Sequence, residues 1–219
     1  MTVSNVDDGD ASYRTVARVG TSETLVERSR FIGRAHPVRS LAEAEAIVAA
    51  LRKEHYDSRH VCYGLKIGRG AVGLDRSNDD GEPAKTGGYP LWQLLEGDDV
   101  TDTVIAVVRY FGGVKLGMGG LSRAYREAGR TALAGAGVEE RWPESAFHLT
   151  VRYDQVDRVN YLLGPLNGVR TEDTAYAGDV RYTLAVRKLD VPDVCERLAV
   201  LLQRDPSDVL SATAELPLC

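Results

Sequence analysis

Hydrophobic and polar positions in the first part of the chain predict strands before any helix. Beta-forming residues recur from Tyr13 to Val38 between turn signals at Gly20 and Gly33. Runs of this kind between turn residues are typical of short strands. The segment is therefore predicted to form two or three strands.

A helix and a hairpin are expected next. Ser40 and Glu43 have the spacing of a capping box, and the apolar residues that follow recur with a helical period. Two beta-prone runs, over 61–67 and 71–74, flank the turn residues Gly68-Arg69-Gly70. This order predicts a helix followed by a beta-hairpin.

The middle of the chain predicts a buried strand between two helices. A short helix is expected over 86–95, with Pro90 in its first turn because proline lacks the amide that an interior position needs. Residues 104–108 are apolar without alternation, as in a central strand covered on both faces. A helix over 120–134 follows, whose predicted inner face consists of Leu121, Ala124, Tyr125, Ala128 and Ala132.

The last third predicts a second unit with the order βαββαβ. Residues 139–144 are expected to form a linker, because charges cluster there around Trp142 and Pro143. Asp154 and Asp190 are the predicted caps of the two helices. The strands are expected near 147–151, 169–175, 180–186 and 209–216. This order is that of a ferredoxin-like domain.

Length and composition bound the fold and the setting. A chain of 219 residues favours two domains, and 43% hydrophobic with 27% charged residues is ordinary for a globular protein. We predict a disordered tail over 1–12 and domains over 13–140 and 144–219. The amino end does not resemble a signal peptide, no apolar run is long enough to span a membrane, and Cys62, Cys195 and Cys219 suggest neither a zinc site nor a disulfide framework. A cytoplasmic protein is expected, and its oligomeric state is left open.

A glycine-rich segment between the buried strand and the following helix is the main candidate binding site. Its backbone amides could turn outward beside the helix start and bind an anion or nucleic acid. The spacing is not that of a Walker A loop, and a tight turn with close packing is an equal alternative. The candidate residues are Arg109, Gly112, Gly113, Lys115, Gly117, Gly119 and Gly120, with Arg123, Arg126 and Arg130 on the polar side of the helix. Because the net charge is -5, any binding of nucleic acid must be local.

Two further groups of residues are less specific candidates for a chemical site. Asp79, Asp80 and Glu82 could form a metal or acidic site, with magnesium the one cofactor considered, but an acidic turn is the preferred interpretation. His60 and Cys62 share one side of a predicted strand, although such neighbours rarely align as base and nucleophile. No cofactor is expected.

The second unit offers a secondary surface. Arg152, Arg181 and Arg187 alternate with apolar positions and should line the open face of its sheet. The aromatic pair that stacks bases on RRM-type sheets is missing there, which disfavours RNA binding of that kind. A docking surface and a solvated face both remain open.

Several strings resemble the signature of the IMPACT/YigZ family, which combines a UPF0029-type N-terminal domain with a DUF1949-type C-terminal domain. The strings are Ser29-Arg-Phe-Ile32, His60-Val-Cys-Tyr63, Asp79-Asp-Gly-Glu-Pro83, Arg109-Tyr-Phe-Gly-Gly-Val-Lys-Leu-Gly-Met-Gly-Gly-Leu121 and Arg123-Ala-Tyr125. They span about residues 28 to 137. The sequence departs at 84–88, where the family commonly reads Ser-Gly-Thr-Ala-Gly and Lys85 replaces the glycine.

The resemblance implies an α+β protein with a ribosomal S5 domain 2-like first domain and a ferredoxin-like second domain. In eukaryotic relatives it implies translation control through binding of a kinase activator. Since the residues define no complete catalytic constellation, we expect a non-enzymatic binder of RNA, the ribosome or a translation-associated protein. The alternative is an enzyme that binds a nucleotide or another phosphate ligand.

Overall fold

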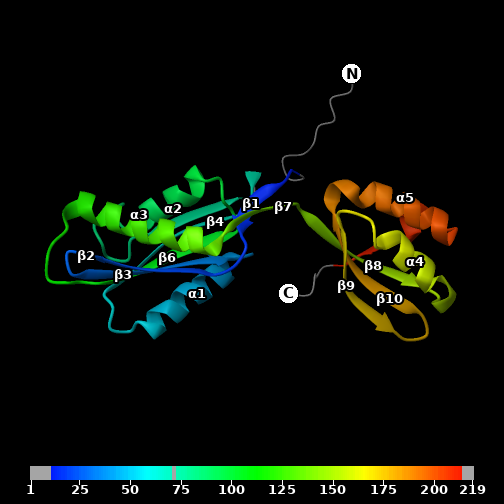
Figure 1. Cartoon of the computed structure of the whole chain (residues 1–219), viewed down its shortest axis with the longest axis horizontal. Helices are drawn as coiled ribbons and strands as arrows, with labels where there is room; N and C mark the ends of the chain where they lie inside the picture. The colour runs from blue at the N-terminus through cyan, green and yellow to red at the C-terminus, as the bar shows by residue number, and fades with distance from the viewer. Residues whose placement is uncertain (1–10, 71–72, 214–219) are drawn as a thin grey trace, which may run out of the picture. The chain divides into compact units, whose positions relative to one another are not determined.

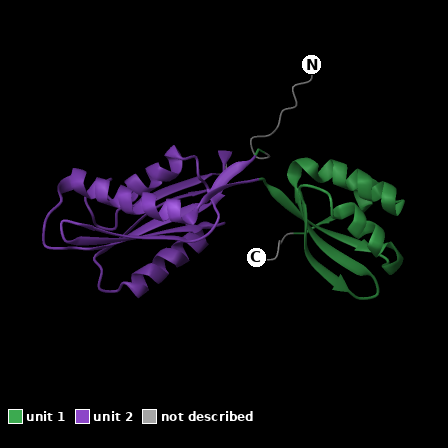
Figure 2. Cartoon of the chain, viewed as in Figure 1, with its two compact units in different colours: residues 1–11, 142–219 green, residues 12–141 purple. Residues whose placement is uncertain are grey.

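The chain folds into two compact units (Figure 2). The computed structural model describes residues 11–70 and 73–213. The first unit is Ser12–Arg141. The second unit begins at Trp142, and the structure describes it as far as residue 213. The predicted tail over 1–12 lies almost entirely outside the described residues.

The first unit contains a five-stranded antiparallel sheet in the order β2-β3-β6-β4-β5. A separate ribbon pairs β1 with β7 (Figure 1). The strands are β1 Tyr13–Val16, β2 Gly20–Val26, β3 Ser29–Pro37, β4 His60–Ile67, β5 Leu74–Asn78, β6 Thr103–Tyr110 and β7 Val138–Arg141. Strand β6 lies at the centre and is buried from Thr103 to Arg109, as its unbroken apolar run predicts.

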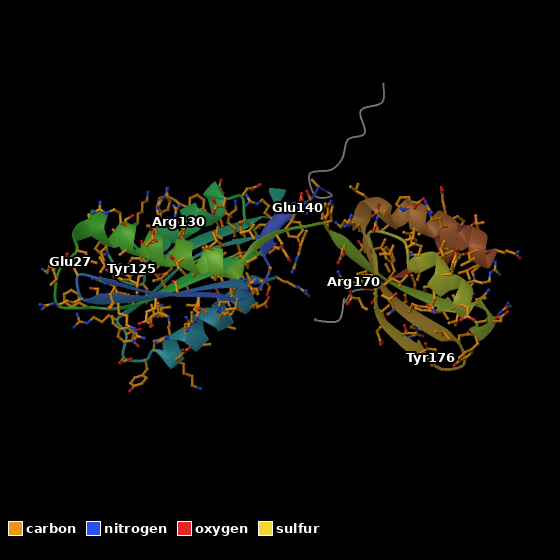
Figure 3. All side chains as sticks on the ribbon, viewed as in Figure 1. Glu27, Tyr125, Arg130, Glu140, Arg170 and Tyr176 are labelled. Carbon is orange, nitrogen blue, oxygen red and sulfur yellow. The ribbon has the colours of Figure 1, made fainter. Side chains whose placement is uncertain are left out.

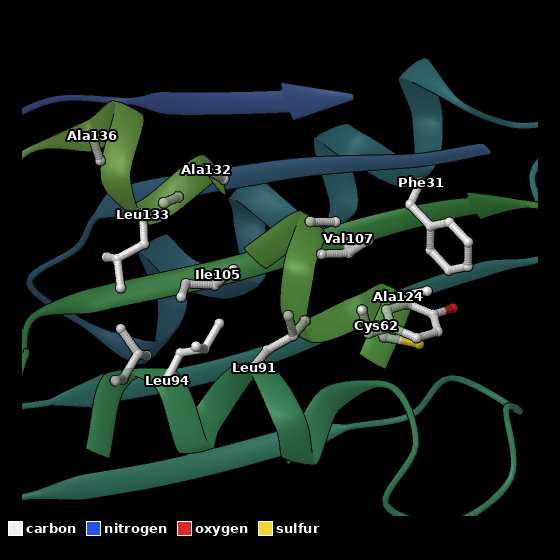
Figure 4. Packing of buried hydrophobic residues seen from close by; sticks show 14 of the residues in the cluster. Phe31, Cys62, Leu91, Leu94, Ile105, Val107, Ala124, Ala132, Leu133 and Ala136 are labelled. Carbon is white, nitrogen blue, oxygen red and sulfur yellow. The ribbon is translucent and has the colours of Figure 1, made fainter. Parts of the chain in front are cut away.

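Helices cover both faces of this sheet. Helix α1, Leu41–Glu54, packs on one face, and α2, Gly88–Gly97, and α3, Gly117–Ala136, pack on the other (Figure 1). Figure 4 shows Leu91 and Leu94 of α2 in the same core as Ile105 and Val107 of β6. The predicted inner face of α3 is buried throughout: Leu121, Ala124, Tyr125, Ala128 and Ala132.

The predicted cap of α1 is confirmed. The Glu43 amide donates a hydrogen bond of 3.2 Å to Ser40 Oγ. The Glu43 carboxylate accepts from the Arg39 amide at 2.8 Å, one residue earlier than a standard capping box would place the donor.

Of the two turn signals in the first strands, Gly20 directly follows the connection from β1 to β2, whereas Gly33 was wrong because it lies inside β3. The β2–β3 turn lies at Glu27 and Arg28, whose φ angles are 46° and 65°. Both glycines allow α3 to approach closely. A Cβ at Gly20 would lie 2.0 Å from the Ala132 carbonyl oxygen, and one at Gly33 would lie 2.7 Å from that of Ala128.

Other boundaries also differ from the expectation. The strand that follows β4 in the chain and pairs with it is β5, Leu74–Asn78, whereas the predicted 71–74 run begins on residues outside the described ones. Helix α3 starts at Gly117 rather than near residue 120. Part of the predicted linker is strand β7, because residues 138–141 pair with β1.

The second unit has the predicted βαββαβ order. Its elements are β8 Glu144–Val151, α4 Val156–Leu163, β9 Val169–Tyr176, β10 Val180–Arg187, α5 Val191–Leu202 and β11 Ser211–Ala212. The sheet order β11-β8-β10-β9 makes the strands run 4-1-3-2, which is the ferredoxin-like arrangement. Both helices pack against the inward side chains of this sheet. The α+β class is confirmed.

The predicted caps of the second unit were wrong in detail. Asp154 lies inside a 3₁₀ turn, Tyr153–Gln155, that precedes α4. Asp190 occupies the predicted N-cap position of α5, but its side chain accepts no hydrogen bond from the helix amides. Among the described residues, no helix is both long and apolar enough to cross a membrane.

Candidate nucleic-acid interface

The connection between β6 and α3 exposes the start of a long helix. We call residues 111–116 the exposed turn. Among the residues that the structure describes, no side chain forms a capping hydrogen bond to α3, and the first turn of this helix contains no acidic residue. The first N–H groups of a helix have no partner within the helix and lie at the positive end of its dipole, so those of α3 are candidate donors to an anion.

Basic side chains lie around this helix start. Lys115 and Arg123 are exposed. The Arg123 guanidinium turns back over the first turn, since its Nη1 would lie 3.7 Å from a Cβ at Gly119. Positive side chains and the first amides of α3 are therefore close together.

The other two arginines of α3 are placed differently. Arg126 donates a 2.6 Å hydrogen bond to Gln93 Oε1 on α2, which holds it partly buried. Arg130 is exposed one turn further along the helix (Figure 3). Of the predicted basic face, Arg123 is thus the member nearest to the first amides of α3.

The glycines of the segment divide into two kinds. A Cβ at Gly112 would lie 2.0 Å from the Arg28 carbonyl carbon, and the Gly112 amide donates to Ser29 Oγ at 3.2 Å. Gly113 and Gly117 have φ angles of 88° and 65°, a region that favours glycine, and have no neighbours within 4 Å of an added Cβ. Gly119 and Gly120 belong to α3. Gly112 serves packing, whereas the others face outward or shape the turn.

Arg109 lies apart from the exposed surface. It is 6% exposed, and its Nη1 forms an ion pair of 2.6 Å with Glu82 Oε1, whose side chain is 4% exposed. Tyr125 donates to the same oxygen at 2.8 Å. We call Glu82, Arg109 and Tyr125 the buried polar cluster. Burial raises the pKa of the Tyr125 hydroxyl, and the negative charge of Glu82 acts in the same direction.

The acidic loop is organised by its own hydrogen bonds. The Asp79 carboxylate accepts from the amides of Lys85, Gly87 and Gly88 at 2.7, 2.9 and 2.8 Å. Asp80 accepts from the Val61 amide at 2.6 Å and pairs with Arg52 at 2.7 Å. Three carboxylates that were considered together thus have separate partners. Within residues 11–70 and 73–213, no group of three His, Cys, Asp or Glu is placed to hold a metal ion.

Lys85 adopts a backbone conformation that favours glycine. Its φ is 62°, and its ammonium lies 5.4 Å from the centroid of the Tyr89 ring. A left-handed conformation is more costly for lysine than for glycine.

Cys62 and His60 are each bound to the backbone of the acidic loop. The Cys62 thiol donates to the Asp79 carbonyl at 3.0 Å, and His60 Nδ1 lies 2.7 Å from the Asp80 carbonyl oxygen. Burial raises the pKa of the Cys62 thiol to about 12. The thiol therefore stays protonated at neutral pH, which is unfavourable for a nucleophile.

The arginines of the second unit do not form one cluster. Arg152 makes two hydrogen bonds of 2.9 Å to Asp154, and this contact holds the pKa of Asp154 below its usual value. Arg187 stacks on Trp142 at 4.2 Å from the ring centroid. Arg181 is exposed opposite Thr150.

Two residues at the site were not anticipated from the sequence. Tyr125 was expected only as an apolar core residue, yet its hydroxyl joins the buried polar cluster. Phe111 was not considered, although it is 44% exposed at the start of the turn. The sequence signal was an aromatic residue directly after the end of a strand and directly before two glycines, a place where its ring is expected to be exposed.

These features define a two-domain α+β protein with a basic surface at one turn of its first domain, and its sequence matches two known domain families. Residues 27–133 match the Impact N-terminal domain, and residues 149–203 match a domain of unknown function, DUF1949. The chain is 36% identical to the IMPACT family member YvyE of Bacillus subtilis over 148 residues, which are 68% of each protein. It is 32% identical to YigZ of Escherichia coli over 175 residues, 80% of this chain and 85% of YigZ. The chain belongs to the IMPACT family.

One solved structure shares the fold over almost the whole chain. A crystal structure described as that of a hypothetical protein is 29% identical, with a TM-score of 0.65 over 94% of this chain and 98% of that one. The two-domain translational regulator Yih1 is 26% identical over 55% of this chain and 47% of its own, with a TM-score of 0.34. The second score is too low to establish a shared architecture.

Proposed function

We propose that this protein is a non-enzymatic binding protein linked to translation regulation. In this proposal it contacts RNA, the ribosome or a translation-associated protein through the exposed turn and the adjoining side of α3. The observation that carries the proposal is the exposure of Lys115 and Arg123 beside the uncapped start of α3. Membership of the IMPACT family supports the link to translation.

The local charge supports an anionic partner despite the acidic chain. Residues 110–126 contain Lys115, Arg123 and Arg126 and no acidic residue, whereas the whole chain has a net charge of -5. At physiological salt, charges are screened over about 8 Å, so a ligand close to the turn senses mainly the local groups. Phosphates are suited to such a surface because helix amides, Lys and Arg all donate to them.

The test is a charge reversal with a matched control. The double variant Lys115→Glu/Arg123→Glu should weaken association with ribosomes or RNA about tenfold or more. The slope of log K against log[salt] should become shallower by about 1.4 if two contacts to phosphates of a single strand are lost. Arg39→Glu/Lys53→Glu makes the same charge change at exposed positions at the start and end of α1, which covers the opposite face of the sheet. Sedimentation with ribosomes and anisotropy with labelled RNA measure both.

The outcomes separate the partner classes. Equal binding by the two double variants would exclude the exposed turn as the contact surface. Suppose that Lys115→Glu/Arg123→Glu loses the association and the control variant keeps it. If the wild type then still associates after nuclease treatment of the extract, the partner is a protein rather than RNA. Thermal melts of both variants should match the wild type, because the four side chains are exposed.

A further inference from the structure

Exposed apolar side chains accompany the basic residues at the exposed turn. Phe111 is 44% exposed, Val114 39% and Met118 62%. They occur within one stretch of eight residues that also contains Lys115. A surface that is only solvated has no need of this combination, whereas contiguous exposed apolar groups rimmed by polar ones mark interaction sites.

The Phe111 ring is supported from within the protein. The Arg109 guanidinium lies 5.5 Å from the centroid of the Phe111 ring and 5.5 Å from that of Phe31. Arg109 is itself fixed by its buried ion pair with Glu82. A ring backed by a fixed cation loses little conformational freedom when a ligand stacks on it.

We propose that Phe111 is a stacking platform for a base of single-stranded RNA, with Lys115, Arg123 and the first amides of α3 binding the adjacent phosphates. This inference rests on the proposed function and narrows its partner class. Every nucleotide of a single strand offers both a flat ring and a phosphate, which are the complements of this surface. A duplex keeps its bases stacked inside and presents mainly phosphate, so it would use only part of the surface.

The experiment compares binding of the full-length protein to labelled ten-nucleotide RNA single strands by fluorescence anisotropy. Phe111→Ala should weaken binding about 5- to 150-fold, the effect expected for loss of one stacked base. Phe111→Trp should keep the affinity, because indole also stacks. Tyr56→Ala is the control: Tyr56 is 86% exposed, and its loss should change nothing. A strand of the same length made of abasic nucleotides should bind the wild type and Phe111→Ala equally weakly.

The failures of the two proposals are distinguishable. If Phe111→Ala binds RNA like the wild type while Lys115→Glu/Arg123→Glu does not, stacking is overturned and the basic surface stands. If the wild type binds ribosomes or a protein but no single-stranded RNA, the stacking proposal is also overturned while the broader function survives. If the charge reversal leaves every association unchanged, the proposed function fails as well. Melting curves should show Phe111→Ala folded, since Phe111 is 44% exposed and does not belong to the hydrophobic core.

Discussion

Two parts of one segment, residues 109–123, do opposite things. Arg109 at its beginning is buried and joins Glu82 and Tyr125 beneath the surface. Lys115 and Arg123, a few residues later, are exposed beside the first amides of α3. Basic residues and glycines occur in both the inner and the outer part, so the two parts are similar in composition. They differ because Arg109 is paired with the buried carboxylate of Glu82, whereas Lys115 and Arg123 are exposed.

The comparison shows how the inner part supports the outer one. Burying an arginine and a glutamate costs desolvation free energy, which their attraction repays only with good geometry and further hydrogen bonds. Here the pair joins the acidic loop, through Glu82, to strand β6 and helix α3. It therefore fixes three pieces of chain under the exposed turn. The buried polar cluster is structural, and the chemistry available to a partner lies on the surface.

The largest expected effect comes from breaking the inner part. Glu82→Ala leaves the Arg109 charge buried without its partner and removes the acceptor of the Tyr125 hydroxyl. The free energy of unfolding should fall by about 3–5 kcal/mol. Urea denaturation followed by circular dichroism measures it.

An exposed ion pair provides the control for that variant. Glu23 pairs with Arg30 at 2.8 Å, but both side chains are about half exposed. Glu23→Ala should therefore change the stability by less than about 1 kcal/mol. If the two variants were equally stable, the buried polar cluster would not hold the loop in place.

A smaller effect should distinguish the inward glycine from an outward one. Gly112→Ala places a Cβ 2.0 Å from the Arg28 backbone, so the β2–β3 turn or the segment must shift, at a cost of about 1–3 kcal/mol. Gly119→Ala meets only Arg123 Nη1 at 3.7 Å and lies in a helix, where alanine is favoured by up to about 1 kcal/mol. Thermal melts should move in opposite directions. Shifts of the same sign would show that the two glycines do not differ in this way.

Much of the fold could be predicted because it depends on local periodicity. The unbroken apolar run of β6 and the helical stripe of α3 identify their elements directly. The positions of the first turns could not be obtained in this way. Gly20 and Gly33 resemble turn residues in sequence, but they lie where α3 crosses the sheet, and that proximity arises only in the folded chain.

The candidate site was predictable only in its outer part. Glycines, Lys115 and Arg123 are close in sequence, so their proximity follows from the chain itself. The burial of Arg109 depends on Glu82, which is 27 residues away, and no local pattern indicates that pairing. Phe111 could not be predicted for the same reason, because the contact of its ring with the Arg109 guanidinium exists only in the folded chain.

An effect seen only at alkaline pH is expected from Cys62, which lies beside the buried polar cluster and has a pKa raised to about 12. Below the ordinary thiol pKa of about 8.5–9, folded and unfolded chains both hold the proton, and the group adds no pH dependence. Above it the unfolded state loses the proton first, so stability falls as pH rises towards 12, by about 1.4 kcal/mol per unit once the unfolded thiol is fully ionised. Cys62→Ala should therefore show a shallower loss of stability between pH 8 and 10 than the wild type, measured by urea denaturation.

Cys195→Ala is the comparison, because Cys195 is only partly buried and should alter the slope less. Equal slopes for the wild type and Cys62→Ala would mean that water reaches the thiol, and the inner part of the segment would then be less closed than its packing indicates.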